Sequence, residues 1–378
     1  MSETILTNTR LVCDDRILDG TLLVRDGRIG AVEAGRSAHP AAVDCDGDYL
    51  APGLIDLHTD ALEGHFVPRP KVVWPDPRAA ALAHDAQTVA SGVTTVFDAI
   101  CAGGFDQAKS IRRELFGVML DAIAAGRPLF RADHRIHLRC ELTDPDVVAL
   151  VAPELARPQL GLASLMDHTP GARQWRNVAH LRTFLLGLGK SAEDVEYELS
   201  ERAARGRAAV AGNFDRLAAL LRDTGIVLAS HDDTTPAHVD LARGAGCTIS
   251  EFPTTQEAAA AARAAGLTTI GGAPNVVRGG SHSGGVAMGD LATAGLLDAL
   301  ASDYVPASLL QAVAVLADRG GRGLPAAMAL VTAAPARMAG LADRGRLTPG
   351  LRADLVRFRL VEGTPVVREV LVEGRRVF

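Results

Sequence analysis

The sequence lacks several features that would place it in a specialised class of protein. Its five cysteines are an odd number, lie far apart and include no CxxC pair, which argues against a disulfide framework and a cysteine zinc site. Its apolar stretches are short and interrupted, so none predicts a membrane span. A Walker-type phosphate loop is absent, which argues against kinase-like chemistry.

Two further absences concern location and charge. The opening residues, MSETILTNTR, lack the basic start, apolar core and cleavage site of a secretory signal, so we expect a cytoplasmic protein. The formal net charge of −6 gives no general attraction to nucleic acid. Lysine is scarce, with only Lys71, Lys109 and Lys190. An anionic ligand would therefore need a local basic pocket.

Both ends of the chain are rich in β-type sequence. Residues 21–35 read TLLVRDGRIGAVEAG, in which Asp-Gly predicts a hairpin between two strands, and residues 366–378 read VVREVLVEGRRVF. Because a small sheet needs several strands to be stable, the two ends are expected to combine. We predict a small β-sandwich domain from residues 1–52 and 340–378, beside a larger domain over residues 53–339.

The middle of the chain alternates apolar β-like runs with Ala-rich helical stretches, as repeated βα units do. The eight candidate strands are 53–59, 93–99, 135–142, 162–168, 225–231, 247–253, 267–273 and 296–303. Eight parallel strands predict an α/β fold of the TIM-like (β/α)8 barrel type. The stretch from Trp175 to Gly225 is mostly helical by propensity and longer than one crossover, so we expect part of it to form a lid or an interface.

Side chains of the metal-ligand type stand at the ends of these strands, where barrel enzymes build their active sites. They are His58 and Asp60 on the first strand, Glu141 on the third, His168 on the fourth, His231 on the fifth and Asp303 on the last. Residues two apart on a strand face the same side, so His58 and Asp60 can serve one pocket. Imidazoles and carboxylates suit zinc, manganese or iron, and a two-metal site can activate water.

This pattern of strand ends resembles the amidohydrolase superfamily. The strings LHTDALEGHFVPRPKVVWP, HLRCEL, SLMDHTPG, ASHDD, EFPTT and GAPNVVRGGSHSGG are more specific. Over nearly the whole chain they resemble a family of triphosphate diphosphatases in the carbon–phosphorus lyase pathway of phosphonate degradation. The resemblance implies hydrolysis of a ribose-based triphosphate to the monophosphate and pyrophosphate, with divalent metal cofactors, two ions of zinc, manganese or magnesium.

The resemblance also implies roles for individual residues. By it, the metal ligands are His58, Asp60, Glu141, His168, His231 and Asp303, and Asp303 also accepts a proton from the attacking water. Asp60 departs from the superfamily, which usually has a second histidine there. Glu141 is expected to bridge the metals, because no lysine ends a clear strand. The superfamily would place His168 and His231 on strands five and six, whereas the strand pattern places them on four and five.

The substrate would need positive charge. Arg69 and Lys71 lie on a proline-bounded loop, and Arg278 and His282 lie in a Gly-rich run whose backbone N–H groups could approach phosphate oxygens. Alternatively, each of these two segments is a solvated turn that binds no substrate. We expect one partner, a small phosphorylated ribose, with neither nucleic acid nor membrane, and leave a homo-oligomer open.

Two other functions are open on these residues. A cyclic-amide hydrolase or deaminase would use the same metals and Asp303, but it would need a neutral substrate pocket in place of the basic one. A metal-free scaffold protein would be expected to have lost some of the metal ligands. Nearby polar residues are assigned to orienting or structural roles, with Asp56 the strongest of them. The others are Glu63, His65, His137, Asp232 and Asp233.

Overall fold

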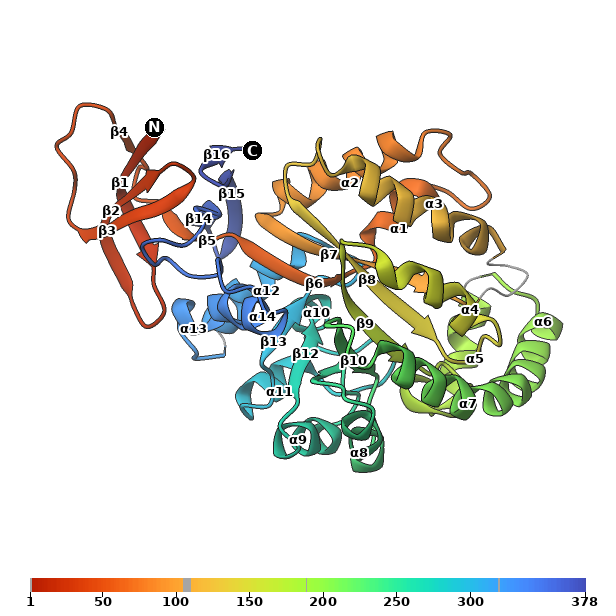
Figure 1. The fold of residues 1–378 in the computed structure, drawn as a ribbon. Helices are drawn as coiled ribbons and strands as arrows, with labels where there is room; N and C mark the ends of the chain where they lie inside the picture. Colours follow the sequence, from red (N-terminus) through yellow and green to blue (C-terminus); the bar gives the residue numbers. More distant parts are fainter. Residues whose placement is uncertain (1, 105–109, 188, 319) are drawn as a thin grey trace.

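The computed structural model describes residues 2–104, 110–187, 189–318 and 320–378, so Lys109 lies outside the described residues. Two sheets organise the chain, a barrel and a smaller sheet built from the two ends, here called the terminal sheet (Figure 1). No helix among the described residues has the length and apolar character that a bilayer crossing requires.

The barrel consists of eight parallel strands in chain order. They are β6 (Leu54–Thr59), β7 (Val93–Ala102), β8 (Asp133–Glu141), β9 (Leu160–Met166), β10 (Val227–His231), β11 (Ile249–Glu251), β12 (Thr268–Gly272) and β13 (Ala299–Ala301). The last meets the first through two backbone bonds, from Asp303 N to His58 O at 3.0 Å and from Asp60 N to Asp303 O at 2.6 Å. The eight predicted strands and the barrel are confirmed.

Helices follow the strands and cover the outside of the barrel. In chain order they are α1 (Ala61–Phe66), α2 (Pro77–Ala90), α3 (Ser110–Gly126), α4 (Val147–Val151), η2 (Ala152–Ala156), α8 (Pro236–Gly244), α9 (Gln256–Ala264), α10 (Ala273–Arg278), α11 (Met288–Thr293), α12 (Ser308–Asp318), α13 (Leu324–Ala329) and α14 (Ala333–Met338). Local sequence marks their ends: Asp76 caps α2 just before a proline, and Thr235 caps α8 in the same way.

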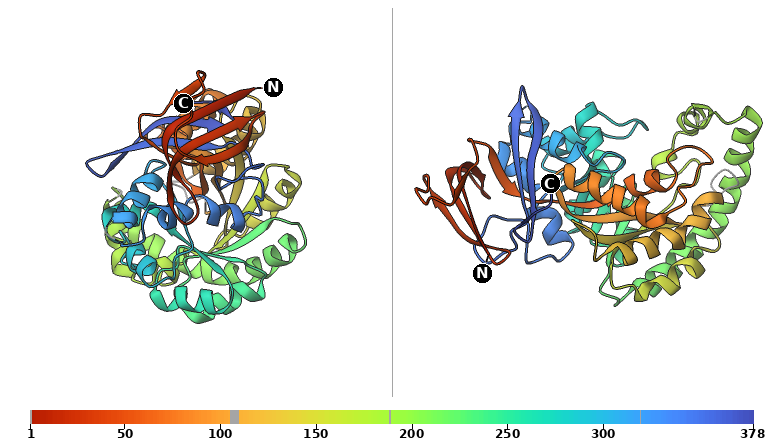
Figure 2. Two further views of the ribbon diagram at one scale, coloured as in Figure 1. Left: turned by 90° about the vertical axis from the view of Figure 1, so that its left-hand side faces the viewer. Right: turned by 90° about the horizontal axis from the view of Figure 1, so that it is seen from above.

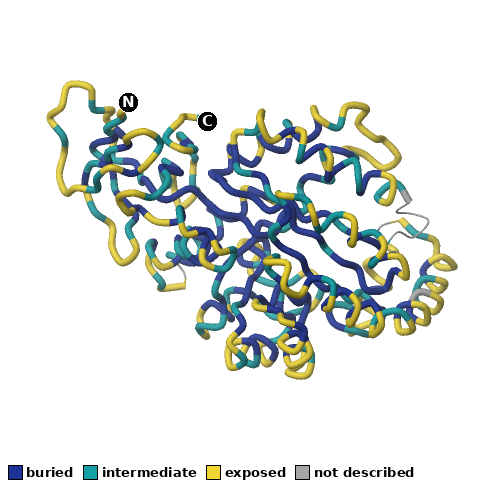
Figure 3. Tube along the Cα trace, in the orientation of Figure 1, coloured by how far each residue is buried: buried dark blue, intermediate teal, exposed yellow. Residues whose placement is uncertain are grey.

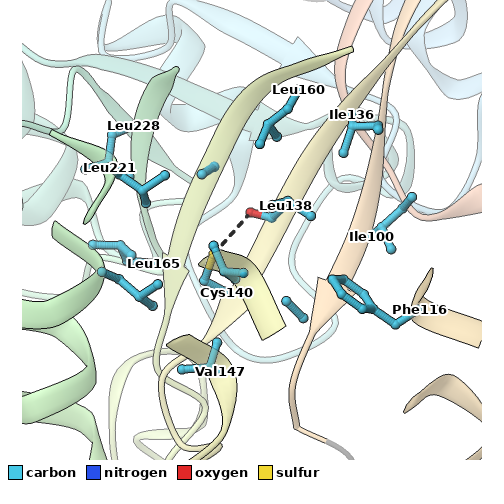
Figure 4. Close-up of a cluster of buried hydrophobic side chains, with 14 of the residues drawn as sticks. Ile100, Phe116, Ile136, Leu138, Cys140, Val147, Leu160, Leu165, Leu221 and Leu228 are labelled. Atoms are coloured by element: carbon cyan, nitrogen blue, oxygen red, sulfur yellow. Dashed lines mark hydrogen bonds between the residues drawn. The ribbon is translucent and has the colours of Figure 1, made fainter. Parts of the chain in front are cut away.

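Apolar side chains hold the helices on the strands. Ile100, Ile136 and Leu138 of the strands belong to one buried cluster with Phe116 of α3 (Figure 4). Cys140 belongs to the same cluster, with its Sγ 3.8 Å from the carbonyl oxygen of Leu138. The strands are the most buried part of the chain, whereas the outer helical turns are exposed (Figure 3). This rigid frame holds the strand ends in place.

A helical segment separates β9 from β10. It contains η3 (Arg173–Trp175), α5 (Val178–Gly187), α6 (Ala192–Tyr197), η4 (Glu198–Arg202) and α7 (Ala203–Leu221). Its helices form the end of the molecule remote from the terminal sheet (Figure 2). Trp175 and Phe184 pack together with ring centroids 5.1 Å apart. The predicted helical character of this stretch is confirmed.

The terminal sheet joins the first 52 residues to the last 24. Its strands are β1 (Glu3–Val12), β2 (Ile17–Arg25), β3 (Arg28–Ala34), β4 (Ala42–Asp44), β5 (Tyr49–Pro52), β14 (Leu355–Val361), β15 (Thr364–Val372) and β16 (Arg375–Arg376). The predicted hairpin turns at Asp26 and Gly27, both with positive φ (48° and 77°), as a type I′ turn requires. β5 pairs with β14, so the two ends of the chain form one β unit, as predicted.

Candidate metal centre

The strand ends of the barrel surround a cavity of about 290 Å³. Its lining contains six side chains from the ends of β6, β9, β10 and β13, namely His58, Asp60, His168, His231, Asp232 and Asp303. Trp175 and Phe184 of the helical segment line another part of the cavity. Five of the six predicted metal ligands therefore meet in one pocket, and Asp232 joins them.

The first of two groups in the pocket comes from β6 and β13. His58 Nε2 lies 3.3 Å from Asp60 Oδ1, and Asp303 offers an oxygen within 4.8 Å of both ligand atoms. Asp56 supports this group from behind, because its Oδ1 accepts from the backbone N–H groups of His58 and Ser302. The first and last strands are thereby tied together beneath the group.

The second group comes from β9 and β10. The Nε2 atoms of His168 and His231 each lie 3.6 Å from Oδ2 of Asp232. That oxygen is buried and has no hydrogen-bond partner among the described residues. The two groups are adjacent, since the rings of His58 and His231 are 6.0 Å apart. A buried carboxylate oxygen without a donor is costly, and a cation would satisfy it.

The spacing within these groups fits metal ligands better than hydrogen bonds. Two ligands of a tetrahedral ion with bonds of about 2.0–2.1 Å lie about 3.4 Å apart. The three contacts inside the groups measure 3.3, 3.6 and 3.6 Å. The contacts that support the histidines from behind measure only 2.6 to 2.8 Å, as charge-assisted hydrogen bonds do. The pocket therefore has the ligand chemistry of a divalent metal site.

Glu251 is absent from the residues that the sequence predicted for this site. It ends β11, is fully buried, and accepts from His58 Nδ1 at 2.8 Å and from His231 Nδ1 at 2.6 Å. Each imidazole must present its Nε2 to the pocket when Nδ1 faces a carboxylate. Its position near the end of the predicted strand 247–253 was the sequence feature that could have identified it as a site residue.

Glu141 stands behind His168. Its Oε2 lies 2.6 Å from His168 Nδ1, and its Oε1 accepts from the Thr143 hydroxyl at 2.7 Å. Glu141 does not line the cavity. This contact orients His168 as Glu251 orients His58 and His231, and the assignment of Glu141 as a bridge between metals stays a prediction.

The electrostatic field of the pocket favours cations. Burial lowers the pKa of His58, but the charge of Glu251 and the contact with Asp60 outweigh it and raise the pKa to about 10. Burial also lowers the pKa of His168, but the negative charge of Glu141 outweighs this effect and raises the pKa to about 9. Histidines that hold protons this firmly mark a negative potential, and metal binding would displace those protons.

Unusual backbone conformations mark three strand ends around the pocket. Asp232, Phe252 and Asp303 have φ values of 55°, 53° and 56°. These values lie in the left-handed region of the backbone, which residues other than glycine rarely adopt. Such conformations persist where the surrounding structure enforces them, and they cluster at functional sites. At Asp232 the turn brings the carboxylate to the same cavity as its neighbour His231.

The predicted substrate-binding residues divide into two sets. His282 lines the cavity, whereas Arg69, Lys71 and Arg278 are exposed and do not line it. Partial burial and the charge of Arg278 lower the pKa of His282. Arg139 of β8, absent from the predicted set, does line the cavity.

The other buried histidines are engaged elsewhere. His137 contacts Leu57 O and Ser164 Oγ, and burial lowers its pKa to about 3, so it is a neutral structural residue. His84 and His134 each bond one oxygen of Asp98, at 2.6 and 2.8 Å. These short contacts describe a hydrogen-bonded cluster between α2 and the strands.

Known proteins resemble this chain in sequence and in fold. No family model matches the chain. The alpha-D-ribose 1-methylphosphonate 5-triphosphate diphosphatase of Escherichia coli (strain K12) is 44% identical over 384 residues, which cover 99% of this chain and 100% of that protein. An L-hydantoinase of Paenarthrobacter aurescens is 34% identical over 65 residues, 17% of this chain and 14% of that enzyme.

Two solved structures show the same fold at low sequence identity. The 5-methylcytosine deaminase from Klebsiella pneumoniae has a TM-score of 0.67 and 16% identity, over 99% of this chain and 98% of that one. The N-isopropylammelide isopropylaminohydrolase from Burkholderia multivorans has a TM-score of 0.65 and 19% identity, over 100% and 98%. The barrel with its added sheet is the fold that this chain shares with both enzymes.

Proposed function

The chain belongs to the alpha-D-ribose 1-methylphosphonate 5-triphosphate diphosphatase family, and we propose that its pocket carries out the hydrolysis this name describes. The substrate is the ribose 5-triphosphate that carries methylphosphonate at C1, and the products are the 5-phosphate and pyrophosphate. The reaction belongs to phosphonate degradation. Identity of 44% along the whole chain carries this proposal.

We propose two divalent cations as cofactors, with zinc, manganese and magnesium as the candidates. His58, Asp60 and Asp303 would hold one, and His168, His231 and Asp232 the other. The separate groups, their spacing and the unpartnered Asp232 oxygen support this assignment. Bound cations would supply Lewis acidity, which makes water more acidic and offsets charge on phosphoryl oxygens.

The side chains of this protein have separate tasks in the proposed reaction. Asp303 accepts the proton of the attacking water, because its carboxylate lines the cavity beside Asp60 and His58. Glu251 and Glu141 keep the Nε2 atoms of three histidines directed at the pocket. Trp175 and Phe184 limit the access of bulk water on one side.

The test is a product assay. Purified protein supplied with zinc, manganese or magnesium should release pyrophosphate from ribose 5-triphosphates, with neither orthophosphate nor ammonia as the primary product. Ammonia without pyrophosphate would support a deaminase, the activity that the shared fold leaves as the alternative. The cytoplasmic location and a homo-oligomeric state stay predictions.

A further inference from the structure

Arg139 lines the cavity of the candidate centre beside Asp60, where three carboxylates would repel an anionic substrate. It belongs to β8, and its side chain is 19% exposed. Among the described residues, it is the one arginine or lysine that lines the cavity, together with Asp60, Asp232 and Asp303. A triphosphate brings several further negative charges to this place. The cation at Arg139 is therefore positioned to influence which ligands enter.

The guanidinium of Arg139 is only partly occupied by protein acceptors. Its NH1 donates to Asp60 Oδ1 at 2.6 Å, and its Nε lies 3.4 Å from Met166 Sδ. A guanidinium carries five N–H donors in a planar fork that matches phosphate oxygens. Within the described part of the chain, NH2 has no hydrogen-bond acceptor. A ligand in the cavity can supply one.

We propose that Arg139 binds a phosphoryl oxygen of the substrate while it holds Asp60 in place, and so selects anionic over neutral substrates. This inference rests on the proposed function, because it assigns a residue to the triphosphate of that reaction. Arg139 differs from Arg69, Lys71 and Arg278, which are exposed and outside the cavity lining. A charge-assisted bond is strongest where water is excluded, which favours the partly buried cation.

The test uses Arg139→Met, Arg139→Lys and, as a matched control, Arg368→Met at an exposed position on β15 of the terminal sheet, outside the cavity lining. Binding of inorganic pyrophosphate and tripolyphosphate is measured by calorimetry with metal-loaded and metal-free protein, beside metal content, kcat and KM. We expect Arg139→Met to weaken anion binding about ten- to hundred-fold in both forms, the usual range for one charge-assisted bond. Arg139→Lys should restore part of it, and the control should bind like the parent.

Two outcomes separate this inference from the proposed function. Parental anion binding by metal-free Arg139→Met, with reduced metal content, would show that Arg139 only holds Asp60, and would overturn the inference. Failure of the parent to release pyrophosphate from ribose triphosphates would overturn the proposed function instead. The calorimetric comparison needs no turnover, so it decides the role of Arg139 in either case.

Discussion

Glu251 contacts two histidines of the candidate centre with one carboxylate, and its side chain is completely buried. We expect Glu251→Gln to lower metal affinity about ten- to hundred-fold, because the amide has one acceptor oxygen and can accept a hydrogen bond from only one of the two imidazoles. A competition titration with a chromogenic chelator measures this loss, and circular dichroism verifies the fold. Glu257→Gln, on the exposed face of α9, is the matched control. Unchanged metal affinity would show that Glu251 does not orient the two histidines for metal binding.

Asp303 is the proposed proton acceptor, and asparagine is the substitution that isolates this role. Asp303 has φ = 56°, a conformation that asparagine tolerates, so the backbone should persist. We expect Asp303→Asn to keep most of the bound metal and to lose about two to four orders of magnitude in kcat. Stopped assays of pyrophosphate beside elemental analysis measure both. Near-parental turnover with metal present would mean that another group accepts the proton.

The sequence predicted most of the centre because parallel strands of a barrel end at one face. His58, Asp60, His168, His231 and Asp303 are all strand-end residues, and the structure brings them together. Asp232 was assigned an orienting or structural role, and neighbours on a regular strand face opposite sides. Its left-handed backbone overrides this alternation, and no residue pattern predicts that turn.

Arg139 was missed for a different reason. Positive charge was expected on loops, whereas Arg139 lies two residues before Glu141 on the same strand. Only the fold shows that Arg139 belongs to the pocket, because its NH1 contacts Asp60 Oδ1 there.

At the scale of elements, strand order was predictable but strand ends were not. β11 and β13 have only three residues each, although the predicted strands covered 247–253 and 296–303. Phe252 and Asp303 leave the strand conformation at these ends, which shortens the regular ladder and directs side chains into the pocket. The placement of His168 and His231 at the fourth and fifth strands agrees with the strand pattern.

The junction between β5 and β6 depends on close packing at Gly53. A Cβ atom there would lie 2.3 Å from Thr94 Oγ1 and 2.4 Å from its Cγ2. We expect Gly53→Ala to lower the free energy of unfolding by about 1–3 kcal/mol, the usual cost of overpacking. Chemical denaturation measures the change.

Gly212 supplies the matched control for this substitution. It lies inside α7, where an added Cβ meets nothing within 4 Å. Gly212→Ala should stabilise the protein by about 0.5–1 kcal/mol, because alanine loses less backbone entropy in a helix. Equal effects of the two substitutions would contradict the packing argument.

At the scale of the whole molecule, the terminal sheet and the barrel share one of the hydrophobic clusters of the core. Ala51, Val356 and Phe358 of the sheet belong to the same cluster as Leu309 and Val313 of α12. The buried path in Figure 3 runs from the terminal sheet into the barrel without an exposed break at β5 and β6. Because the core is continuous, the two parts should unfold together.

Phe358→Ala tests this coupling. Phe358 is 1% exposed and stacks on Tyr49 with ring centroids 5.3 Å apart, so its removal should cost about 3–5 kcal/mol. Both tryptophans, Trp74 and Trp175, lie outside the terminal sheet, so their fluorescence follows the barrel alone.

If the core is shared, the variant shifts the fluorescence transition and the circular dichroism transition to lower denaturant together, since coincident transitions indicate one cooperative unit. Val366→Ala, a half-exposed position on β15 of the same sheet, should leave both transitions close to those of the parent. A fluorescence transition that stays at its parental position while the dichroism signal divides into two steps would show that the sheet unfolds alone. In that case, the barrel would hold its metal centre without support from the ends of the chain.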